Sequence, residues 1–575
     1  MTAITSKVAG DRITSADINS LATAIQGAVS HSNHAIDGYL LDKGHSIAGI
    51  RIATEFDTAK HAGTDADPWS GAAIQAAIND LPSGRTEIGV VDIPAGVWLA
   101  GQRIDVPSYT MVVIRGRITV SPGATYNLFQ NSDLVNGNSY LYFIGNGGIL
   151  DGTGSSDSRA ISVTASAGPS SDSNIVVRGL VIHDFNHATN QNATVFIQSS
   201  DRVWVEDNDI YNGRNAVEVA TGELAFVCRN RIDNMSVIGI LLQNGQKNTI
   251  VMDNTINGPT VAPENFGIEL YLNQTGCIIS NNYIRNCDNA IATRVNSNAS
   301  NCVISDNVIE ESAKGIYLQN SSKFSISDNW IQTTASATVS AAGIRLDNSP
   351  DCSMIGNWIR SGLNYCIDTR KAHRLTVVGN VLSGAAGWRE EPANANDDRL
   401  IASNMCSNLS TTGAAFLAIR GNRNSIVANR VFASTAGIHG IIISQGKDNF
   451  VSGNRVNVTG TAFSISTGST NTIVVENWIS GSPALSDSGS GTVKKRNTGY
   501  KTENGGDSSI SHGTSISHGL ATTPNRIIVT GQSRSARHLQ VRSKSASTFT
   551  VGLWNTAGSA MSESNSDRAF WYAEV

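Results

Sequence analysis

A four-residue pattern, followed by a fifth residue of any type, recurs in the middle of the chain. Its variable positions include residues able to do acid–base chemistry. The pattern is a small residue, an aliphatic residue, any residue and an aliphatic residue, as in GILL at 239–242, GIEL at 267–270 and GIRL at 343–346. In a strand, the two aliphatic residues face one side, and the third and fifth positions face the other. The third positions are Glu218, Leu241, Glu269, Ala292, Tyr317, Arg345 and Asp368. The fifth positions are Ala220, Gln243, Tyr271, Arg294, Gln319, Asp347 and Arg370.

Glu218 and Glu269 are the first candidates for catalytic acid and base. Glycoside hydrolysis uses two carboxyl groups, one of them protonated, about 6.5–9.5 Å apart in inverting enzymes and about 5–5.5 Å apart in retaining ones. If successive repeats stack as strands, these two residues lie two repeats and about 9.6 Å apart along the backbone. Side-chain reach then brings them into the inverting range.

Asp347 and Asp368 form the second candidate pair, one repeat apart, and Arg345 and Arg370 beside them would keep both ionised. The arginines also suit acidic sugars, or the base of a lyase. The same residues can instead form solvated salt-bridge ladders, each contributing under about 1 kcal/mol.

Aromatic and cationic side chains on the same rows are candidates for substrate binding. Tyr271 and Tyr317 offer flat apolar faces on which sugar rings stack. Arg294, Arg345 and Arg370 are the candidate cationic contacts. The segment GWREEPANANDDR at 387–399 replaces an expected strand, and Trp388 with its acidic neighbours forms either a groove wall or an exposed loop. Longer repeats at 257–266 and 332–342 are expected to project as loops bordering this strip.

The elements that must position these residues follow from a second repeat, an asparagine that returns every 22 to 28 residues. Two or three short strands with turns between them fit into each interval, which is typical of one coil of a parallel β-helix. Stacked asparagine amides are expected to hydrogen-bond from coil to coil. The residues are Asn208, Asn230, Asn254, Asn282, Asn307, Asn329, Asn357, Asn380, Asn404, Asn429, Asn454 and Asn477.

Composition excludes several classes of function. Among 575 residues, 15% are charged and the formal net charge is −5, so there is no broad cationic surface for nucleic acid. The sequence shows no apolar run long enough to span a membrane, and its start lacks the pattern of a secretory signal. We therefore expect synthesis in the cytoplasm without membrane insertion. The seven cysteines contain no C-x-x-C pair and are expected to be buried apolar residues, with no metal site and no cofactor.

Residues 65–100 contain an acidic turn at Asp65 and Asp67, the helix pattern AAIQAAI and the strand pair VVDIPAGVWL. This stretch resembles the N-terminal cap of the pectate-lyase-like superfamily of right-handed β-helix proteins, with Trp98 in place of the usual tyrosine. The resemblance covers about residues 60–485. It implies an all-β fold, a right-handed parallel β-helix with a short N-terminal helix and cap. The superfamily holds lyases, hydrolases, epimerases and viral spikes; this chain has neither the DPHE motif of alginate epimerases nor the WIDH motif of pectate lyases.

Segments at both ends complete the expected organisation. An amphipathic helix is predicted at 12–29 and a polar linker at 486–509, followed by alternating strands that predict a small C-terminal antiparallel β-domain. The opening HGL-x-x-TP of that domain is similar to C-terminal domains of phage tail proteins. The expected segments are an N-terminal attachment segment at 1–45, a cap with first coils at 46–130, a β-helix body at 131–485, the linker, and the β-domain at 510–575.

The order of attachment segment, capped β-helix and terminal β-domain resembles a bacteriophage tailspike. The resemblance implies a homotrimeric virion tail protein that is held by a tail or baseplate protein through its N-terminus. Its expected ligand is a bacterial surface polysaccharide, either capsule or lipopolysaccharide O-antigen, which it binds and depolymerises by hydrolysis. The alternatives are a non-catalytic adhesive spike and a bacterial polysaccharide lyase or epimerase.

Overall fold

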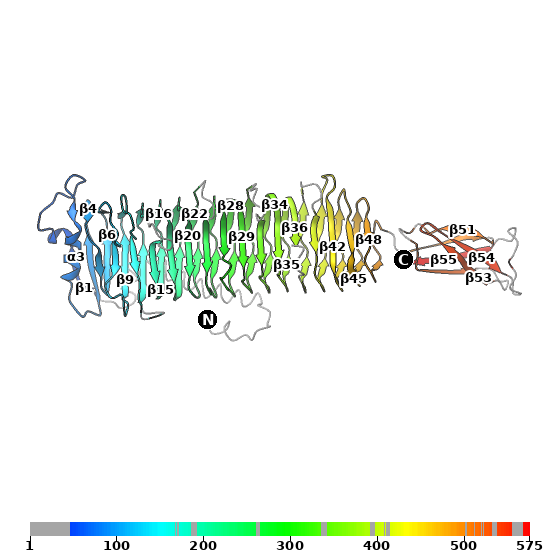
Figure 1. Cartoon of the computed structure of the whole chain (residues 1–575), viewed down its shortest axis with the longest axis horizontal. Coiled ribbons are helices and arrows are strands. Elements are labelled where there is room, and N and C mark those ends of the chain that lie inside the picture. The colour runs from blue at the N-terminus through cyan, green and yellow to red at the C-terminus, as the bar shows by residue number, and fades with distance from the viewer. Residues whose placement is uncertain are drawn as a thin grey trace.

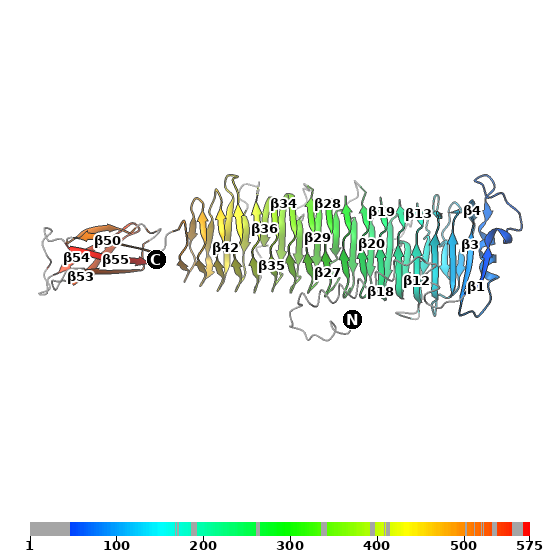
Figure 2. The ribbon, with the colours of Figure 1, turned by 180° about the vertical axis from the view of Figure 1, so that it is seen from behind.

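The chain folds into a long rod of stacked coils, with a cap at one end and a small separate β-domain at the other (Figure 1 and, from behind, Figure 2). The computed structural model describes residues 47–574 except 167, 169–171, 186–192, 260–264, 335–341, 391–396, 408, 410–414, 501–502, 511, 519, 521–522, 532–537, 555–559 and 561–566. The N-terminal segment at 1–45 and the helix predicted at 12–29 lie outside the described residues. No helix within the described ranges is long and apolar enough to cross a membrane.

The predicted cap helix is confirmed as α3 (Gly71–Asn79), which follows the short helix η1 (Ala53–Phe56). Ser70 begins α3, because its Oγ accepts a hydrogen bond from the backbone N–H of Ala72 at 3.2 Å. Ile74 and Ile78 on its inner face are buried, so the helix closes the apolar end of the rod, which would otherwise expose unpaired strand edges.

One face of the rod is an 18-stranded sheet, here sheet A, whose members pair in parallel from coil to coil. Its strands are β1 (Ile47–Ile52), β3 (Ile88–Ile93), β6 (Thr110–Ile114), β9 (Ser139–Gly145), β12 (Asp172–Arg178), β15 (Ser200–Glu206), β18 (Glu223–Cys228), β21 (Ile250–Met252), β24 (Ile278–Ser280), β27 (Val303–Ser305), β30 (Ser325–Ser327), β33 (Ser353–Ile355), β35 (Thr376–Val378), β37 (Leu400–Ala402), β40 (Ser425–Val427), β43 (Phe450–Ser452), β46 (Ile473–Val475) and β49 (Val493–Lys495).

The remaining faces belong to a 31-stranded sheet made of two rows of strands. Row B, which follows sheet A in each coil, contains β2 (Trp69–Ser70), β4 (Val97–Ala100), β7 (Arg117–Val120), β10 (Ile149–Asp151), β13 (Val181–His183), β16 (Asp209–Tyr211), β19 (Arg231–Asp233), β22 (Thr255–Asn257), β25 (Tyr283–Arg285), β28 (Val308–Ser312), β31 (Trp330–Thr333), β34 (Trp358–Arg370), β36 (Val381–Glu390), β38 (Met405–Ser407), β41 (Arg430–Phe432), β44 (Arg455–Asn457) and β47 (Trp478–Ser480).

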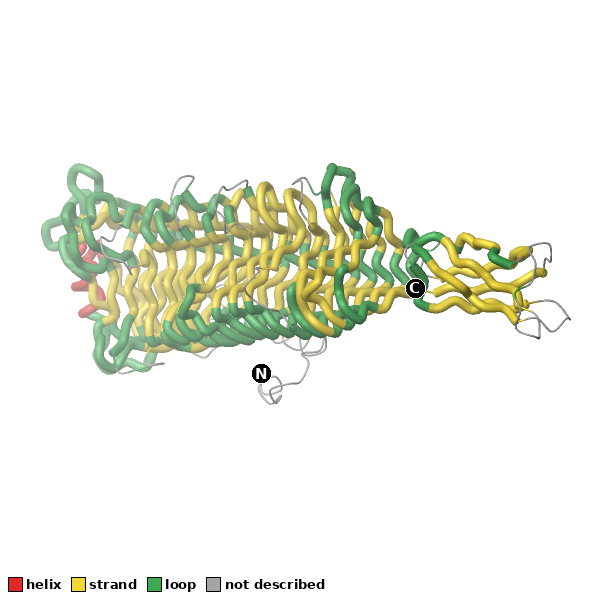
Figure 3. The backbone as a smooth tube through the Cα atoms, turned by 45° about the vertical axis from the view of Figure 1, so that its right-hand side comes forward, coloured by secondary structure: helices red, strands yellow, loops and turns green. Residues whose placement is uncertain are grey.

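Row C carries the pattern found in the sequence, and the long strands β34 and β36 run through both rows. Its other strands are β5 (Ile104–Val106), β8 (Phe129–Asn131), β11 (Ile161–Val163), β14 (Ala193–Gln198), β17 (Asn215–Ala220), β20 (Ile238–Gln243), β23 (Phe266–Tyr271), β26 (Asn289–Thr293), β29 (Lys314–Gln319), β32 (Ala342–Asp347), β39 (Ala415–Ile419), β42 (His439–Lys447), β45 (Phe463–Thr470) and β48 (Leu485–Asp487). Figure 3 shows the strands running in bands along the rod, with loops at the corners between them.

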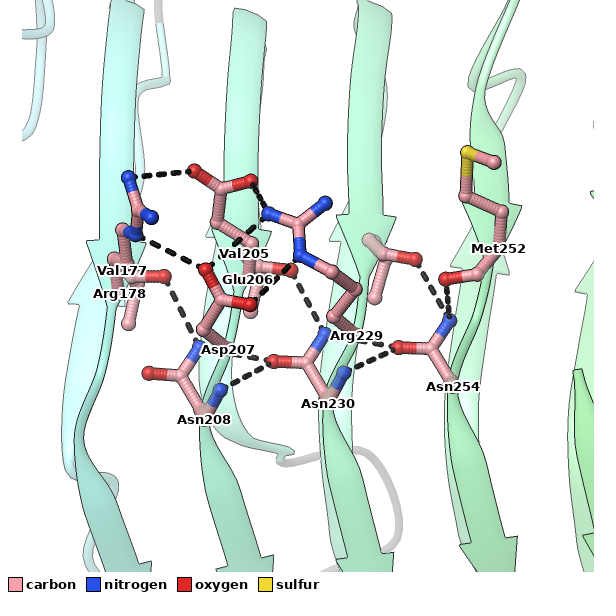
Figure 4. A network of polar contacts seen from close by, with 11 residues as sticks. Val177, Arg178, Val205, Glu206, Asp207, Asn208, Arg229, Asn230, Met252 and Asn254 are labelled. Atoms are coloured by element: carbon pink, nitrogen blue, oxygen red, sulfur yellow. Dashed lines mark hydrogen bonds and ion pairs between the residues drawn. The ribbon is translucent and has the colours of Figure 1, made fainter. Parts of the chain in front are cut away.

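The asparagine ladder predicted from the sequence is confirmed (Figure 4). The side-chain amide of Asn230 donates to Asn254 Oδ1 at 3.0 Å and to the carbonyl of Val205 at 2.8 Å. The residue before each asparagine has a left-handed backbone, as at Arg229 with φ 54°, so the amide stands at a sharp corner between sheet A and row B. The same contacts repeat from Asn208 to Asn497, and they fix the register of the coils.

The cysteine prediction is also confirmed, because all seven cysteines are free and buried. Each behaves as a small core residue, as at Cys277 and Cys302 in adjacent coils. Burial raises the pKa of the Cys302 thiol well above its usual value, so it is held protonated.

The segment predicted as a linker differs from the prediction, because the β-helix continues into it. Strands β48 and β49 pair in parallel with β45 and β46, and the next strand already begins at Glu503. The C-terminal domain is antiparallel, as expected, with one three-stranded sheet of β50 (Glu503–Ile510), β55 (Asp567–Glu574) and β52 (Arg526–Gly531). A second contains β51 (Thr514–Ser517), β54 (Thr548–Trp554) and β53 (His538–Lys544).

Candidate functional site

The outward rows predicted from the sequence are present in row C in the expected register. Glu218 pairs with Leu241, and Leu241 with Glu269, while the flanking aliphatic residues such as Ile240 and Leu242 enter the core. Farther along, Tyr317 pairs with Arg345. Here the third-position row denotes Glu218, Leu241, Glu269, Ala292, Tyr317, Arg345, Asp368 and Arg389.

Arg389 was missed by sequence reasoning, and Trp388 was misplaced by it. Segment 387–390 is the end of strand β36, so the expectation of a loop there is wrong. Trp388 points into the core, where 1% of it is exposed and its indole N–H donates to Thr369 Oγ1 at 2.9 Å. It is therefore not a groove-wall or substrate-binding residue. The sequence did hold a signal, since G-W-R-E repeats the small–apolar–any order with tryptophan in the inward place.

Glu218 is the most perturbed carboxyl group on this face. Only 2% of the residue is exposed, and burial raises the pKa of its carboxyl group to about 8, against the opposing charge of Arg159 and with a further contribution from Glu269. Arg159 lies with its guanidinium group 4.0 Å from the centre of the Phe196 ring and donates to Ser162 Oγ at 3.2 Å. The Glu218 carboxyl is therefore mostly protonated near neutral pH.

Glu269 lies in the same row but has a direct cationic partner. Its carboxylate is bound by Arg294, whose Nη2 donates to Oε2 at 3.2 Å and whose Nε forms an ion pair with Oε1. Burial raises the pKa of Glu269, and Arg294 counteracts this. The Arg294 side chain is 45% exposed and stands over Phe266 and Tyr271, whereas the Glu269 side chain beneath it is 1% exposed. Arg294 thus covers the carboxylate from the solvent side.

These four residues, Arg159, Glu218, Glu269 and Arg294, are here called the acid cluster. The environments of the two carboxyl groups differ, since one has a bidentate guanidinium partner and the other does not. A protonated acid and an ionised base held on one face are the requirement for general acid–base chemistry.

The second candidate pair belongs to a network built on Asp368, the arginine cluster. Asp368 is buried and accepts from Arg389 at 2.8 and 3.2 Å and from Arg370 at 3.5 Å. Arg345 lies 4.0 Å from the same carboxylate and donates to Asp347 at 3.3 Å. Asp368 is thus surrounded by guanidinium groups, and it serves to hold them together. Asp347 is more exposed and takes a smaller part in the network.

Aromatic rings flank the arginine cluster and extend the strip. The Arg345 guanidinium lies 4.7 Å from the centre of the Tyr317 ring, and that of Arg389 lies 4.4 Å from Tyr365. Tyr271 lies beside Arg294 at 5.5 Å. Cationic and aromatic residues therefore lie in contact along row C, and Tyr365 and Arg389 join those named from the sequence. The loops expected at 257–266 and 332–342 lie partly outside the described residues, as does Glu391.

One further group of metal-ligating side chains occurs within the described part of the chain. Asp151, His183 and Asp184 hold ligand atoms within 4.8 Å of one another on row B, and His183 stacks on Tyr211 with ring centres 5.0 Å apart. His183 Nδ1 lies 2.8 Å from Asp184 and 3.7 Å from Asp151. A histidine between two carboxylates is also the geometry of an ordinary ion pair.

Comparison with protein families finds a match over part of the β-helix. Residues 252–430 and 337–489 match a family described as periplasmic copper-binding protein (NosD). The Asp151 group lies outside both matched segments. A search of curated protein sequences gives no match.

Several solved structures resemble the chain in fold. A mutant tailspike protein of E. coli bacteriophage HK620 aligns with a TM-score of 0.51 at 13% identity, covering 91% of this chain and 93% of that one. Another tailspike mutant of that phage, in complex with a hexasaccharide, gives 0.48 at 14% identity, with 88% and 89% covered. The A-module of the Azotobacter vinelandii mannuronan C-5 epimerase AlgE6 gives 0.42 at 13% identity, with 70% and 98% covered. The chain has a tailspike-like parallel β-helix fold.

Proposed function

We propose that this protein is a phage tailspike that binds a bacterial surface polysaccharide, capsule or lipopolysaccharide, and hydrolyses its glycosidic bonds. Support comes from the fold and from the row C strip, which combines carboxyl, guanidinium and phenol groups. The observation that carries the hydrolytic part is the contrast within the acid cluster. The pKa of Glu218 is raised to about 8, while Glu269 carries a bidentate arginine.

In this proposal Glu218 is the general acid. Its proton passes to the glycosidic oxygen while the bond from that oxygen to the anomeric carbon breaks. Glu269, as the general base, takes a proton from a water molecule whose oxygen forms the new bond to the anomeric carbon. The products are one new reducing end and one alcohol, and proton transfer through water restores both carboxyl groups.

The separation of the two strands favours inversion at the anomeric carbon. Leu241 occupies the place between Glu218 and Glu269, so the strands are two coils and about 9.6 Å apart. A separation on this order leaves room for the attacking water between base and sugar, whereas retention needs about 5–5.5 Å.

The arginine cluster and its tyrosines supply the binding part of the proposal. Rings such as Tyr271 and Tyr317 give sugar-stacking faces, and Arg345 and Arg370 give cationic contacts for polar or acidic substituents. The assembly expected from the resemblance, a homotrimer attached to the virion through its N-terminus, is part of the same proposal.

One observation favours a second candidate, a purely adhesive spike. Glu218 and Glu269 are 2% and 1% exposed, so Arg294 must move before a glycan reaches Glu269. A protein that only binds would use the exposed Arg294 and the partly exposed Arg370 and tyrosines, and would leave the acids as buried structural groups.

The experiment is incubation of the purified chain with capsule and lipopolysaccharide from a panel of host bacteria, followed by chain-length and end-group analysis. Hydrolysis gives shorter polymers with new reducing ends and no ultraviolet absorbance. A lyase gives unsaturated, ultraviolet-absorbing ends. Binding with an unchanged polymer across the panel contradicts the hydrolytic proposal and supports the adhesive one.

A further inference from the structure

Part of sheet A, from β21 to β46, has an outer face without charge. In each of its strands from β21 to β46 the middle residue enters the core, and the first and third residues face outward. All of these outward residues are aliphatic, methionine, phenylalanine, serine or threonine. They pair in register from coil to coil, as Leu400 does with Ser425 and Ser425 with Phe450, and form two continuous uncharged rows.

Charged residues lie on the same sheet beyond both ends of these rows. Towards the cap, Glu206 on β15 joins Arg178 and Arg229 in a network of ion pairs, seen in Figure 4. Towards the C-terminal domain, Lys495 ends β49 and pairs with Glu574 at 3.0 Å. The uncharged face is therefore a bounded patch, because the same sheet carries ionised residues where the patch stops.

A row of residues of alternating charge borders the patch, in the turns that precede the strands. From the coil of β30 to the coil of β43, these residues are Lys323, Asp351, Arg374, Asp398, Arg423 and Asp448. Arg374 contacts Asp351 at 2.5 Å, and Arg423 contacts Asp398 at 2.6 Å. An apolar centre beside a polar, solvated rim is the arrangement of a protein–protein interface.

Several large apolar side chains on the patch remain open to solvent. Ile355, Phe450 and Ile473 are 42%, 38% and 38% exposed. Ten three-residue strands spaced by about 4.8 Å give a flat footprint of roughly 500 Å². Two such footprints reach about 1,000 Å², which is the lower bound of a specific interface.

The length and the repeat of the patch restrict which partner can bind it. It is straight, runs along the rod and repeats at the coil spacing, so a partner must present an equally long surface with the same repeat. A second copy of this chain has that spacing over the same number of coils. Because the two rows carry no charge, copies that meet through the same face experience no repulsion between like charges.

We propose that the outer face of sheet A, from β21 to β46, is the surface through which copies of this chain associate side by side. This inference specifies the surface behind the assembly in the proposed function. It does not depend on glycan cleavage, and the product analysis above can fail while this association stands.

The test measures the mass of the full chain by sedimentation velocity and light scattering. The wild type is expected to form an oligomer of at least twice the 60.7 kDa chain mass. Ser425→Asp combined with Ser452→Asp places two charges on the patch and is expected to give the 60.7 kDa monomer. Both serines are partly exposed, so the change leaves the core intact.

The matched control is Ser464→Asp combined with Ser486→Asp, which puts the same charges on the outer face of row C. This variant is expected to keep the mass of the wild type. Circular dichroism and thermal unfolding verify that both variants fold. A monomeric wild type, an oligomer that survives the sheet A variant, or equal dissociation of the control overturns the proposal.

Discussion

Glu218 and Glu269 lie in one outward row with Leu241 between them, and Arg294 is bound to Glu269 while Arg159 acts on Glu218 from the other side. Two carboxyl groups of the same type thus have different surroundings on one surface. The difference comes from burial, which acts on both groups, and from the bidentate arginine, which acts on Glu269.

Replacing either carboxyl group separates catalysis from binding. Glu218→Gln and Glu269→Gln are each expected to lower turnover of the glycan about 100-fold or more, because a general acid or base contributes about 10²–10⁴. Affinity for the uncleaved polymer should remain, as measured by surface plasmon resonance. Glu223→Gln, at an exposed site on β18, is the control. Full turnover in both variants would contradict the proposed roles.

Arg294→Ala tests the base. Removing the guanidinium withdraws the charge that favours the ionised form, so the pKa of Glu269 rises further. The base is then protonated over a wider range, and the acid limb of the plot of kcat against pH moves to higher pH. The exposed Arg360→Ala on row B should leave the limb in place. An unmoved limb in the Arg294 variant would exclude Glu269 as the base.

Glu218 also makes stability depend on pH. Its carboxyl releases its proton at about 8 in the folded chain, against 4.5 for the ordinary group, so the folded state holds more protons between these values. The free energy of unfolding therefore falls as pH rises through this window. Glu218→Gln has no proton to lose, and relative to the wild type it should gain stability from pH 5 to pH 8, on the order of a few kcal/mol.

Thermal unfolding of both proteins at the two pH values measures this effect. We expect the Tm of the variant minus the Tm of the wild type to be larger at pH 8 than at pH 5. A difference that is the same at both values would show that the Glu218 carboxyl titrates normally.

The asparagine ladder predicts that loss of one side-chain amide strongly lowers the stability of the protein. Asn282→Ala removes the partner of Asn254, Val251 and Asn307 in a buried place. Each unsatisfied buried group costs about 1–3 kcal/mol, so Tm should drop by several degrees. Asn296→Ala, at an exposed turn, should change the free energy of unfolding by less than about 0.5 kcal/mol. Equal effects of the two changes would argue against a stabilising ladder.

Asp368 and Asp347 are expected to differ in the same assay. Asp368→Ala leaves Arg389 and its neighbours without their buried carboxylate and should cost about 3–5 kcal/mol of stability. Asp347→Ala removes a more exposed partner of Arg345 and should cost less than about 1 kcal/mol. The reverse order would mean that Asp368 does not organise the arginines.

The fold could be predicted from the sequence because the same residue types recur at equivalent positions of each coil. Asn254, Asn282 and Asn307 recur at a corner that needs an amide, and the aliphatic pair after each small residue sets which side chains enter the core. The cap helix follows from AAIQAAI in the same way. The continuation of the coils through 486–495 was missed, because that stretch is rich in glycine and serine and its only strand signals are short.

The site was less accessible to sequence reasoning, because residue type and register do not reveal burial. Glu218 was placed on the correct row, yet its low exposure depends on neighbouring segments packed around it. Trp388 was interpreted by its acidic neighbours instead of by its place in the repeat, and Arg389 was lost with it. Reading 387–390 as one more copy of the pattern would have recovered both.

The asparagine ladder has a direction. In each coil the side-chain N–H of one asparagine points to the side-chain carbonyl oxygen of the next, from Asn208 as far as Asn497. The amide dipoles are therefore aligned head to tail along the rod, and each polarises the next, strengthening the bonds by about 10–30%. A substitution near the middle of the ladder divides one long row of aligned amides into two shorter rows. It therefore removes more of this mutual strengthening than a substitution near either end.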